Sequence, residues 1–152
     1  MSMELYTFSN LPHELQQQFA AEISTETNSQ FGVEQKIVPV TMKAILQRGI
    51  GVVALQDEAL AGYVGVTNMY NGHAQVGTLV VPEHAQGSGV GKLLVANVTE
   101  HAVRVDLQPF AFCNPSSRSS FEAAGYTPAL PGALPPEAHS QFNNQPMIYP
   151  RS

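Results

Sequence analysis

The chain has 152 residues, of which 43% are hydrophobic and 12% charged, with a formal net charge of −5. We therefore expect residues 1–152 to form one domain, without the broad basic surface of a nucleic-acid-binding protein. The single cysteine excludes an internal disulfide and a cysteine metal cluster. No apolar run reaches ~18 residues and the first residues lack a signal-peptide pattern, so a cytoplasmic protein without a membrane partner is expected.

The first third of the chain predicts a strand followed by two helices. The strand covers residues 3–8, and Ser9 and Asn10 are suitable caps for a helix with Pro12 in its first turn. One apolar face recurs every four residues at Leu11, Leu15, Phe19 and Ile23. This helix is expected to end near Thr25, before a polar loop over 27–31. A second helix is expected over 40–47, ended by Gly49.

Three further strands are predicted in the middle third of the chain. Strands are predicted over 50–56 and 60–67, joined by a turn at Asp57-Glu58. Asn71-Gly72 is a strong hairpin signal and leads into a strand over 74–81. Pro82 cannot donate to a sheet ladder, so this strand ends before it.

A glycine-rich turn and a helix come next. Residues 86–91 read Gln-Gly-Ser-Gly-Val-Gly, so the backbone can approach a ligand without a Cβ in the way. Helical spacing begins there and places apolar residues at Val90, Leu93, Leu94, Val98 and Ala102. The free N–H groups of the loop and the positive helix end then point at one spot. This arrangement predicts an anion site, most often a phosphate site.

Two other phosphate loops do not fit these residues. A Walker loop requires glycine where Gln86 stands and a hydroxyl where Leu93 stands, so a P-loop NTPase is rejected. A dinucleotide fold requires Gly-x-Gly-x-x-Gly near the start of a βαβ unit, whereas these glycines alternate in mid-chain.

The last third predicts a strand, a short helix and a proline-rich segment. The strand covers 106–113, and the helix covers 115–124 with Asn114 as its N-cap and Gly125 at its end. A sixth strand begins at Tyr126, and residues 147–149 are the candidate for a last one. Residues 128–146 hold five prolines and are read either as a disordered loop or as a rim of the acceptor site.

Two motifs, in order, carry a family resemblance. Residues 86–91 match Gln/Arg-x-x-Gly-x-Gly/Ala after the strand end Leu79-Val80-Val81, and residues 114–126 are similar to Asn-x-x-Ala-x-x-x-Tyr-x-x-x-Gly-Phe. The sequence therefore resembles the GNAT (Gcn5-related N-acetyltransferase) superfamily. The resemblance implies an α/β (α+β) fold with a mixed, mostly antiparallel central sheet flanked by helices. It also implies acetyl-CoA as cosubstrate. His13, His101 and His139 show no ligand-like spacing, so no metal is expected.

The resemblance also implies which residues hold coenzyme A. Backbone groups of the central strand would pair with pantetheine amides, and the glycine loop would hold the pyrophosphate. The predicted coenzyme-binding residues are Leu79, Val80, Val81, Gln86, Gly87, Ser88, Gly89, Val90, Gly91, Lys92, Asn114, Ser117 and Phe121.

The resemblance assigns the catalytic residues less directly than the coenzyme-binding residues. Phe121 stands where the family often has a tyrosine that protonates the leaving thiolate, so Ser120, Tyr126 or water would have to replace it. Candidates for the base that deprotonates the amine are His73, Glu83 and His84. His73 ranks first, because period two places it on one face with Gln75, Gly77, Leu79 and Val81. Cys113 is read as a small buried residue, with an acyl-carrier role as the alternative.

The sequence thus predicts an N-acetyltransferase that moves acetyl directly from acetyl-CoA to a primary amine, with a small molecule favoured as acceptor. The first alternative is an acyl-CoA-binding or regulatory module with little turnover, for which Phe121 argues. The second alternative is a protein N-terminal acetyltransferase. A homodimer is expected only by analogy, because many proteins of the family dimerise.

Overall fold

The computed structural model describes residues 3–31, 50–130, 132–138 and 144–150. Seven strands of these residues form one sheet, in the order β1-β2-β3-β4-β5-β7-β6. The strands are β1 Met3–Thr7, β2 Gly51–Gln56, β3 Ala59–Tyr70, β4 His73–Val80, β5 Gln108–Cys113, β6 Thr127–Pro128 and β7 Gln145–Ile148. Five of the six pairings are antiparallel, and β4 with β5 is parallel. The predicted mixed, mostly antiparallel sheet is confirmed.

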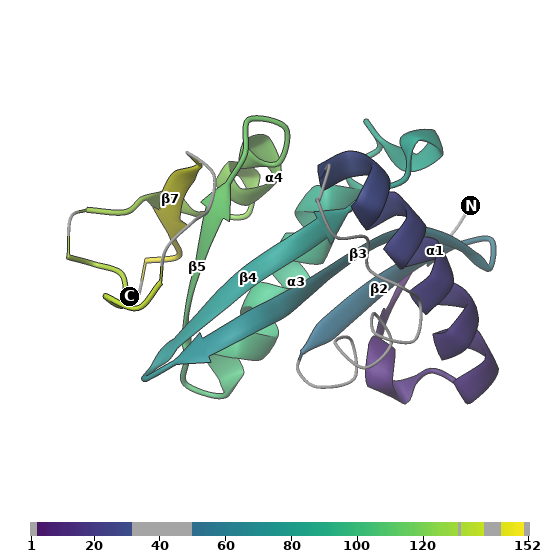
Figure 1. Ribbon diagram of the computed structural model, residues 1–152, viewed down its shortest axis with the longest axis horizontal. Coiled ribbons are helices and arrows are strands. Elements are labelled where there is room, and N and C mark those ends of the chain that lie inside the picture. Colours follow the sequence, from purple (N-terminus) through teal and green to yellow (C-terminus); the bar gives the residue numbers. More distant parts are fainter. Residues whose placement is uncertain (1–2, 32–49, 131, 139–143, 151–152) are drawn as a thin grey trace.

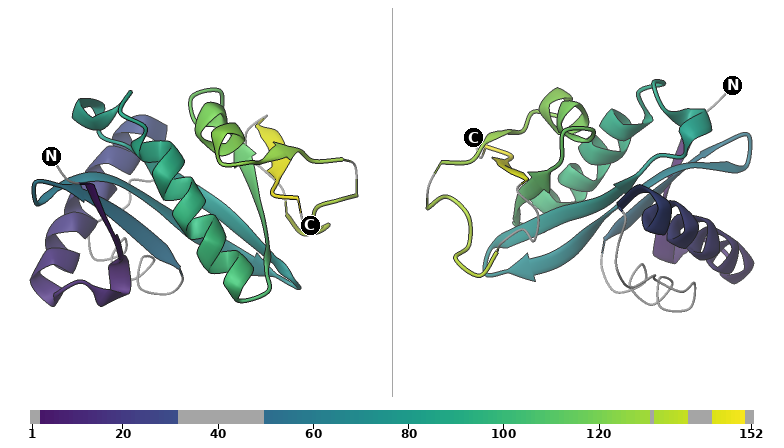
Figure 2. Two further views of the ribbon diagram at one scale, coloured as in Figure 1. Left: turned by 180° about the vertical axis from the view of Figure 1, so that it is seen from behind. Right: turned by 45° about the horizontal axis from the view of Figure 1, so that its top comes forward.

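Helices cover both faces of this sheet. Helix α1, His13–Phe31, lies on one face, and α3, Val90–Arg104, crosses the other (Figures 1 and 2). The short helix α4, Arg118–Ala123, lies on the α3 side beside β5 (Figure 2). Single 3-10 turns at Phe8–Asn10 and Glu83–Ala85 lead into α1 and into the glycine loop. No helix among the described residues is long and apolar enough to cross a membrane.

Each sheet face buries its own apolar core. On the α1 face, Phe19 and Ile23 of the helix pack with Val53 and Tyr63 of the sheet. On the α3 face, the helix contributes Val90, Leu94, Val95 and Val98 to a larger core. Burying such side chains contributes roughly 1.5–3 kcal/mol each, so the two helices hold the sheet rigid from both sides.

Several sequence predictions differ from the structure. Helix α1 does not end near Thr25 but continues to Phe31, so the expected polar loop over 27–31 is wrong. Thr25 is compatible with the helix because its hydroxyl donates a hydrogen bond to the Ala21 carbonyl, 3.1 Å away. Strand β3 extends three residues further than predicted, to Tyr70. The helix expected over 40–47 lies outside the described residues.

The last third also needs correction. The short helix begins at Arg118 rather than at residue 115, because 115–117 form a turn first. Asn114 caps that turn, since its Oδ1 accepts the Ser117 N–H at 2.8 Å. The last strand, β7, is predicted over 147–149 but runs from Gln145 to Ile148, so it begins two residues earlier and ends one residue earlier than expected. Part of the proline-rich segment, residues 131 and 139–143, lies outside the described residues.

Candidate active site

Strands β4 and β5 form a fork. They pair only at their first three residues, where His73, Ala74 and Gln75 lie beside Gln108, Pro109 and Phe110. Beyond Gln75 the two strands diverge, which Figure 1 shows as a widening gap between them. The edge of β4 that faces β5 is therefore unpaired inside the sheet, and its backbone groups can bond an extended ligand as a further strand would.

A β-bulge in β4 changes which side chains face the fork. Val80 pairs with Tyr63 but Gly77 pairs with Gly65, so β4 has one residue more than β3 between the pairs. Before the bulge, Val76 faces the α3 core; after it, Leu79 and Val81 do. The prediction that His73 and Gln75 share a face with Leu79 and Val81 is therefore wrong, because one extra residue reverses the alternation.

The glycine loop closes the wide end of the fork. Gly87 and Gly89 have φ values of +81° and +84°, which residues with a Cβ adopt only under strain. Gly89 is the N-cap of α3, so the free N–H groups of the first turn point out of the loop. Gln86 holds the loop to the strand end by donating from Nε2 to the Val81 carbonyl at 3.0 Å.

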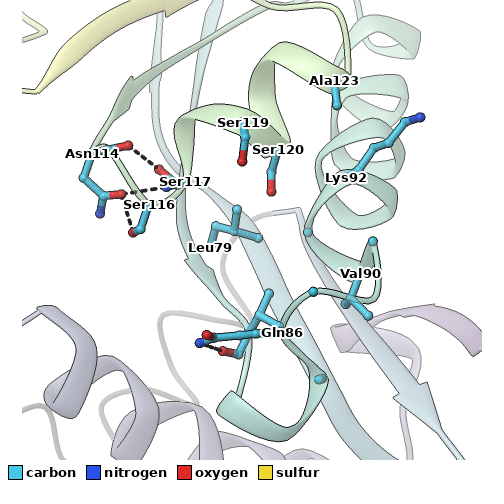
Figure 3. A pocket seen from close by; sticks show the side chains of 15 residues that line it. Leu79, Gln86, Val90, Lys92, Asn114, Ser116, Ser117, Ser119, Ser120 and Ala123 are labelled. Carbon is cyan, nitrogen blue, oxygen red and sulfur yellow. Dashed lines mark hydrogen bonds between the residues drawn. The ribbon is translucent and has the colours of Figure 1, made fainter.

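The start of α4 forms the opposite wall of the fork. Asn114 Oδ1 accepts hydrogen bonds from Ser116 Oγ and from the Ser117 N–H, both at 2.8 Å, which fixes the turn. Figure 3 shows the Ser119 and Ser120 side chains directed toward Leu79 and the glycine loop across the gap. A Cβ on Gly91 would lie 2.5 Å from Ser120 Oγ, so α4 approaches the first turn of α3 closely.

Between these walls lies an open cleft with a volume of about 590 Å³. Its lining residues are Leu79, Val81, Ala85, Gln86, Gly87, Gly89, Val90, Gly91, Lys92, Asn114, Ser116, Ser117, Ser119, Ser120 and Ala123. Lys92 is the only lining residue among these with a charged side chain. Uncharged hydrogen-bonding groups, a helix N-terminus and one cation suit a long, mostly neutral ligand with an anionic end.

Most of the predicted coenzyme-binding residues line this cleft. Ten of the thirteen do so: Leu79, Val81, Gln86, Gly87, Gly89, Val90, Gly91, Lys92, Asn114 and Ser117. Val80 is fully buried on the other side of β4, opposite Tyr63. Ser88 bonds its hydroxyl back to the Ala85 carbonyl at 2.5 Å, and Phe121 is buried in the α3 core. These three side chains do not face the cleft.

The predicted catalytic residues are far apart. His73 lies at the first paired end of β4, six residues from Leu79, or roughly 20 Å at the usual rise of a strand. Its Nδ1 is 3.3 Å from the Asn71 carbonyl, in the hairpin, so the structure does not bring His73 to the cleft. Ser120 does line the cleft, beside Leu79 and Gly91.

Two other predicted candidates are buried elsewhere. Tyr126 Oη is 2.6 Å from Thr99 Oγ1 in the core, and burial raises the Tyr126 pKa, so this phenol has no proton to offer in the cleft. Cys113 is buried, and burial raises the pKa of its thiol to about 12, so it is neutral at pH 7 and a poor acyl carrier. Among the described residues, no group of three or more His, Cys, Asp or Glu could hold a metal ion.

The sequence reasoning missed four lining residues: Ala85, Ser116, Ser119 and Ala123. The serines had a visible signal, since residues 116–120 contain four serines at a helix start. Small hydroxyl side chains let a ligand approach while still offering hydrogen bonds.

A cleft of this kind suits an elongated, anion-bearing ligand that lies in the gap of a forked sheet. The chain belongs to the acetyltransferase (GNAT) family, whose model matches residues 13–126. A comparison with curated proteins gave no significant match.

Solved structures with the same fold include three with distant sequences. An acetyltransferase of the GNAT family from Staphylococcus aureus Mu50 has 12% identity and a TM-score of 0.71, covering 97% of this chain and 98% of its own. The yncA protein of Salmonella typhimurium, solved with acetyl-CoA, has 13% identity and a TM-score of 0.71, covering 97% of this chain and 91% of its own. N-acetylglutamate synthase of Neisseria gonorrhoeae, with coenzyme A and N-acetyl-glutamate, has 15% identity and a TM-score of 0.73, covering 99% of this chain and 36% of its own.

Proposed function

We propose that the protein is an acetyl-CoA-dependent N-acetyltransferase that acetylates a primary amine of a small molecule. The observation that carries this proposal is the fork of β4 and β5, closed at its wide end by the glycine loop. Coenzyme A has the matching order of groups: a pyrophosphate for the loop, an amide-bearing arm for the open strand edge, and a thioester for the fork. Acetyl-CoA and coenzyme A occupy the related structures from Salmonella and Neisseria, which supports the same ligand here.

The binding residues divide the coenzyme between them. The N–H groups from Gly87 to Gly91 and the Lys92 ammonium would hold the pyrophosphate at the N-terminus of α3. The backbone at Leu79 and Val81 would pair with the amides of the pantetheine arm, with Asn114 on the opposite wall. These contacts leave the thioester near the narrow part of the fork.

The chemistry is a direct acyl transfer. The free amine attacks the thioester carbonyl, a C–N bond forms, the C–S bond breaks, and the amine loses a proton as the thiolate gains one. Backbone N–H groups of β4 near the bulge stabilise the oxyanion, and binding brings the two reactants together. Among the described cleft residues, Ser120 is the candidate for donating a hydrogen bond to the thiolate.

The proposal is tested by calorimetric titration with acetyl-CoA and with coenzyme A, followed by thiol detection in an amine screen. Micromolar binding of both, with thiol released only when an amine is present, is the expected result. If neither acetyl-CoA nor coenzyme A bound, the assignment of the cleft as a coenzyme site would be overturned.

A second candidate function is an acyl-CoA-binding module with little turnover. It is favoured by Phe121, which has no acidic proton and packs edge-on against Tyr126 with ring centroids 5.1 Å apart. Binding of acetyl-CoA without thiol release for any amine would support this module over the enzyme.

A further inference from the structure

The sheet face opposite the coenzyme cleft carries a second set of groups at the fork, and this inference rests on the proposed function. Val76 and Ala111 face the α3 core, so their neighbours Gln75 and Phe110 face the α1 side by strand alternation. Gln75 and Phe110 are also the last paired residues before the strands diverge. They therefore stand at the apex of the fork, on the face turned toward the viewer in Figure 1.

An amine must reach the thioester from this face. The coenzyme, α3 and the start of α4 would fill the other side of the fork, so the amine would approach the carbonyl from the α1 side. Gly77 follows Gln75 on the same face, and the Thr67 side chain covers it. A Cβ there would already contact the Thr67 side chain at 3.1 Å.

The Gln75 carboxamide is oriented by its neighbours on β3. Its Oε1 accepts hydrogen bonds from Asn68 Nδ2 at 3.4 Å and from Tyr70 Oη at 3.5 Å. Both donors occupy the oxygen, so the Nε2 group is the part of the amide turned to other partners. No hydrogen bond of Gln75 Nε2 is formed with the described residues, and the side chain is half-buried.

Aromatic rings surround this amide. Phe110 is fully buried, and its ring centroid is 6.0 Å from Tyr70 and 5.9 Å from Phe112. No Lys, Arg, Asp or Glu side chain belongs to the described residues of this face at the fork, which are Thr67, Asn68, Tyr70, His73, Gln75, Gly77, Phe110 and Phe112. A carboxylate or a second ammonium on the acceptor would find no counter-charge among these groups, and burying it there would be costly.

We propose that Gln75, held by Asn68 and Tyr70, selects the acceptor by donating from Nε2 to an uncharged oxygen near the reacting amine. The acceptor class is then an amine with a neutral carbonyl or amide and an apolar, aromatic body, rather than an amino acid or a polyamine. Tyr70 and Phe112, which are half-buried, would pack against that body with edge or offset geometry, over the fully buried Phe110 ring.

The test uses acetyl-CoA with four amines that differ in one group: phenylalaninamide, 2-phenylethylamine, phenylalanine and 1,4-diaminobutane. Rates of thiol release are compared at equal concentrations of free base. Phenylalaninamide should give the highest kcat/KM, 2-phenylethylamine about tenfold less, and the two with an added charge the least. A preference for phenylalanine or 1,4-diaminobutane would overturn the inference.

Variants separate recognition from folding. Gln75→Ala should lower kcat/KM for phenylalaninamide about tenfold, leave 2-phenylethylamine within twofold, and leave acetyl-CoA affinity unchanged. Gln56→Ala, at the end of β2 remote from the fork, is the matched control and should change neither amine. Equal losses for both amines in Gln75→Ala would overturn the assignment. Failure of the wild type to bind acetyl-CoA would overturn the proposed function itself, whereas turnover of the charged amines alone would overturn only this inference.

Discussion

At the scale of single residues, Gly89 meets two requirements at once. Its φ of +84° places it in the left-handed region, and it caps α3 where an anion would bind. A Cβ there would meet no protein atom within 4 Å, so a side chain at this position would not disturb the packing. It would strain the backbone and stand in the way of a bound anion. Strain alone costs roughly 1–2 kcal/mol.

Gly89→Asp is expected to weaken coenzyme A binding at least about tenfold, because a carboxylate would face the pyrophosphate at close range. Isothermal titration calorimetry measures this directly. Gly72→Asp is the matched control, since Gly72 has a φ of +79° and equally open surroundings but lies in the β3–β4 hairpin. Equal affinities for the two variants would contradict the phosphate-loop assignment.

Ser120→Ala tests the candidate proton donor. We expect kcat to fall about tenfold while the Kd for coenzyme A stays within twofold, because the hydroxyl would act on the leaving thiolate rather than on bound coenzyme. Steady-state kinetics with thiol detection measures the first quantity and calorimetry the second. Ser116→Ala, a substitution at another lining serine, is the control; an unchanged kcat in Ser120→Ala would assign the proton transfer to water.

At this scale the glycines that line the cleft were visible in the sequence, whereas the faces of the β4 side chains were not. Glycines at 87, 89 and 91 have a local signature, and all three lie where expected. The faces of Leu79 and Val81 were misassigned, because the β4 bulge depends on pairing with β3 and has no signature in β4 itself. The sequence indicated only that Gln75 shares a face with His73, because its partners Asn68 and Tyr70 come together only in the folded hairpin.

At the scale of elements, β2 and β3 each place a glycine against the ring of the same tyrosine. Tyr63 lies on the α1 face, and its ring covers Gly51 on β2 and Gly65 on β3. A Cβ on Gly51 would be 2.9 Å from the Tyr63 hydroxyl, and one on Gly65 would be closer still. The two glycines therefore make room for the ring, and this explains glycines within strands that otherwise favour larger side chains.

Gly65→Ala should destabilise the protein by about 2 kcal/mol through overpacking against the Tyr63 hydroxyl. In a Tyr63→Phe background the same substitution should cost less, because the clashing oxygen is gone. Urea unfolding of the four proteins forms a double-mutant cycle that measures the coupling. Additive costs would show that the contact does not determine the stability of these strands.

Helix α1 shows why an element's end was predicted less well than its existence. The apolar repeat at Phe19 and Ile23 predicted the helix, and both side chains are fully buried. Beyond Ile23 the sequence becomes polar, which suggested a loop. Ser24 and Thr27 are nevertheless buried on the helix face that carries Ile23. No glycine or proline occurs between Pro12 and Gly32, so nothing local stops the helix, and tertiary packing outweighs its weak propensity.

At the scale of the whole molecule, the basic side chains of the described residues belong to two helices. The described parts of the first 60 residues contain no Lys or Arg but carry Glu4, Glu14, Glu22, Glu26, Asp57 and Glu58. The cations of the described residues, Lys92, Arg104 and Arg118, all belong to α3 and α4. Arg104 and Arg118 are paired with Glu100 and Glu122, so Lys92 is the one that remains for an anion on the coenzyme side.

Stability should fall in alkali. Burial raises the pKa of Tyr63 and of Tyr126 above the ordinary phenol value of 10.0, so each phenol stays protonated in the fold when it would ionise in the unfolded chain. The stabilisation is complete below pH 10 and is lost as the pH rises above it. Urea unfolding at pH 8 and pH 10.5 should show a lower free energy of unfolding at the higher pH, with a smaller drop in Tyr126→Phe. A free energy that is equal at both pH values would contradict this account.

The fold as a whole could be read from sequence because two motifs fixed the order of its elements. The fork could not, because it depends on β5 leaving β4 after three pairs, which neither strand encodes alone. The role of the segment over 128–146 stays a prediction, as does a homodimer.

The β4 bulge also has a consequence for protein engineering. Because one extra residue separates the two faces, the strand is divided into a stretch that would contact the acceptor, around Gln75 and Gly77, and a stretch that would contact the coenzyme, from Leu79 onward. Libraries that vary only the first stretch could alter the choice of amine while retaining coenzyme affinity. A single-residue deletion between the stretches would instead exchange inward and outward side chains along half of the strand, so this position should tolerate substitutions far better than changes in length.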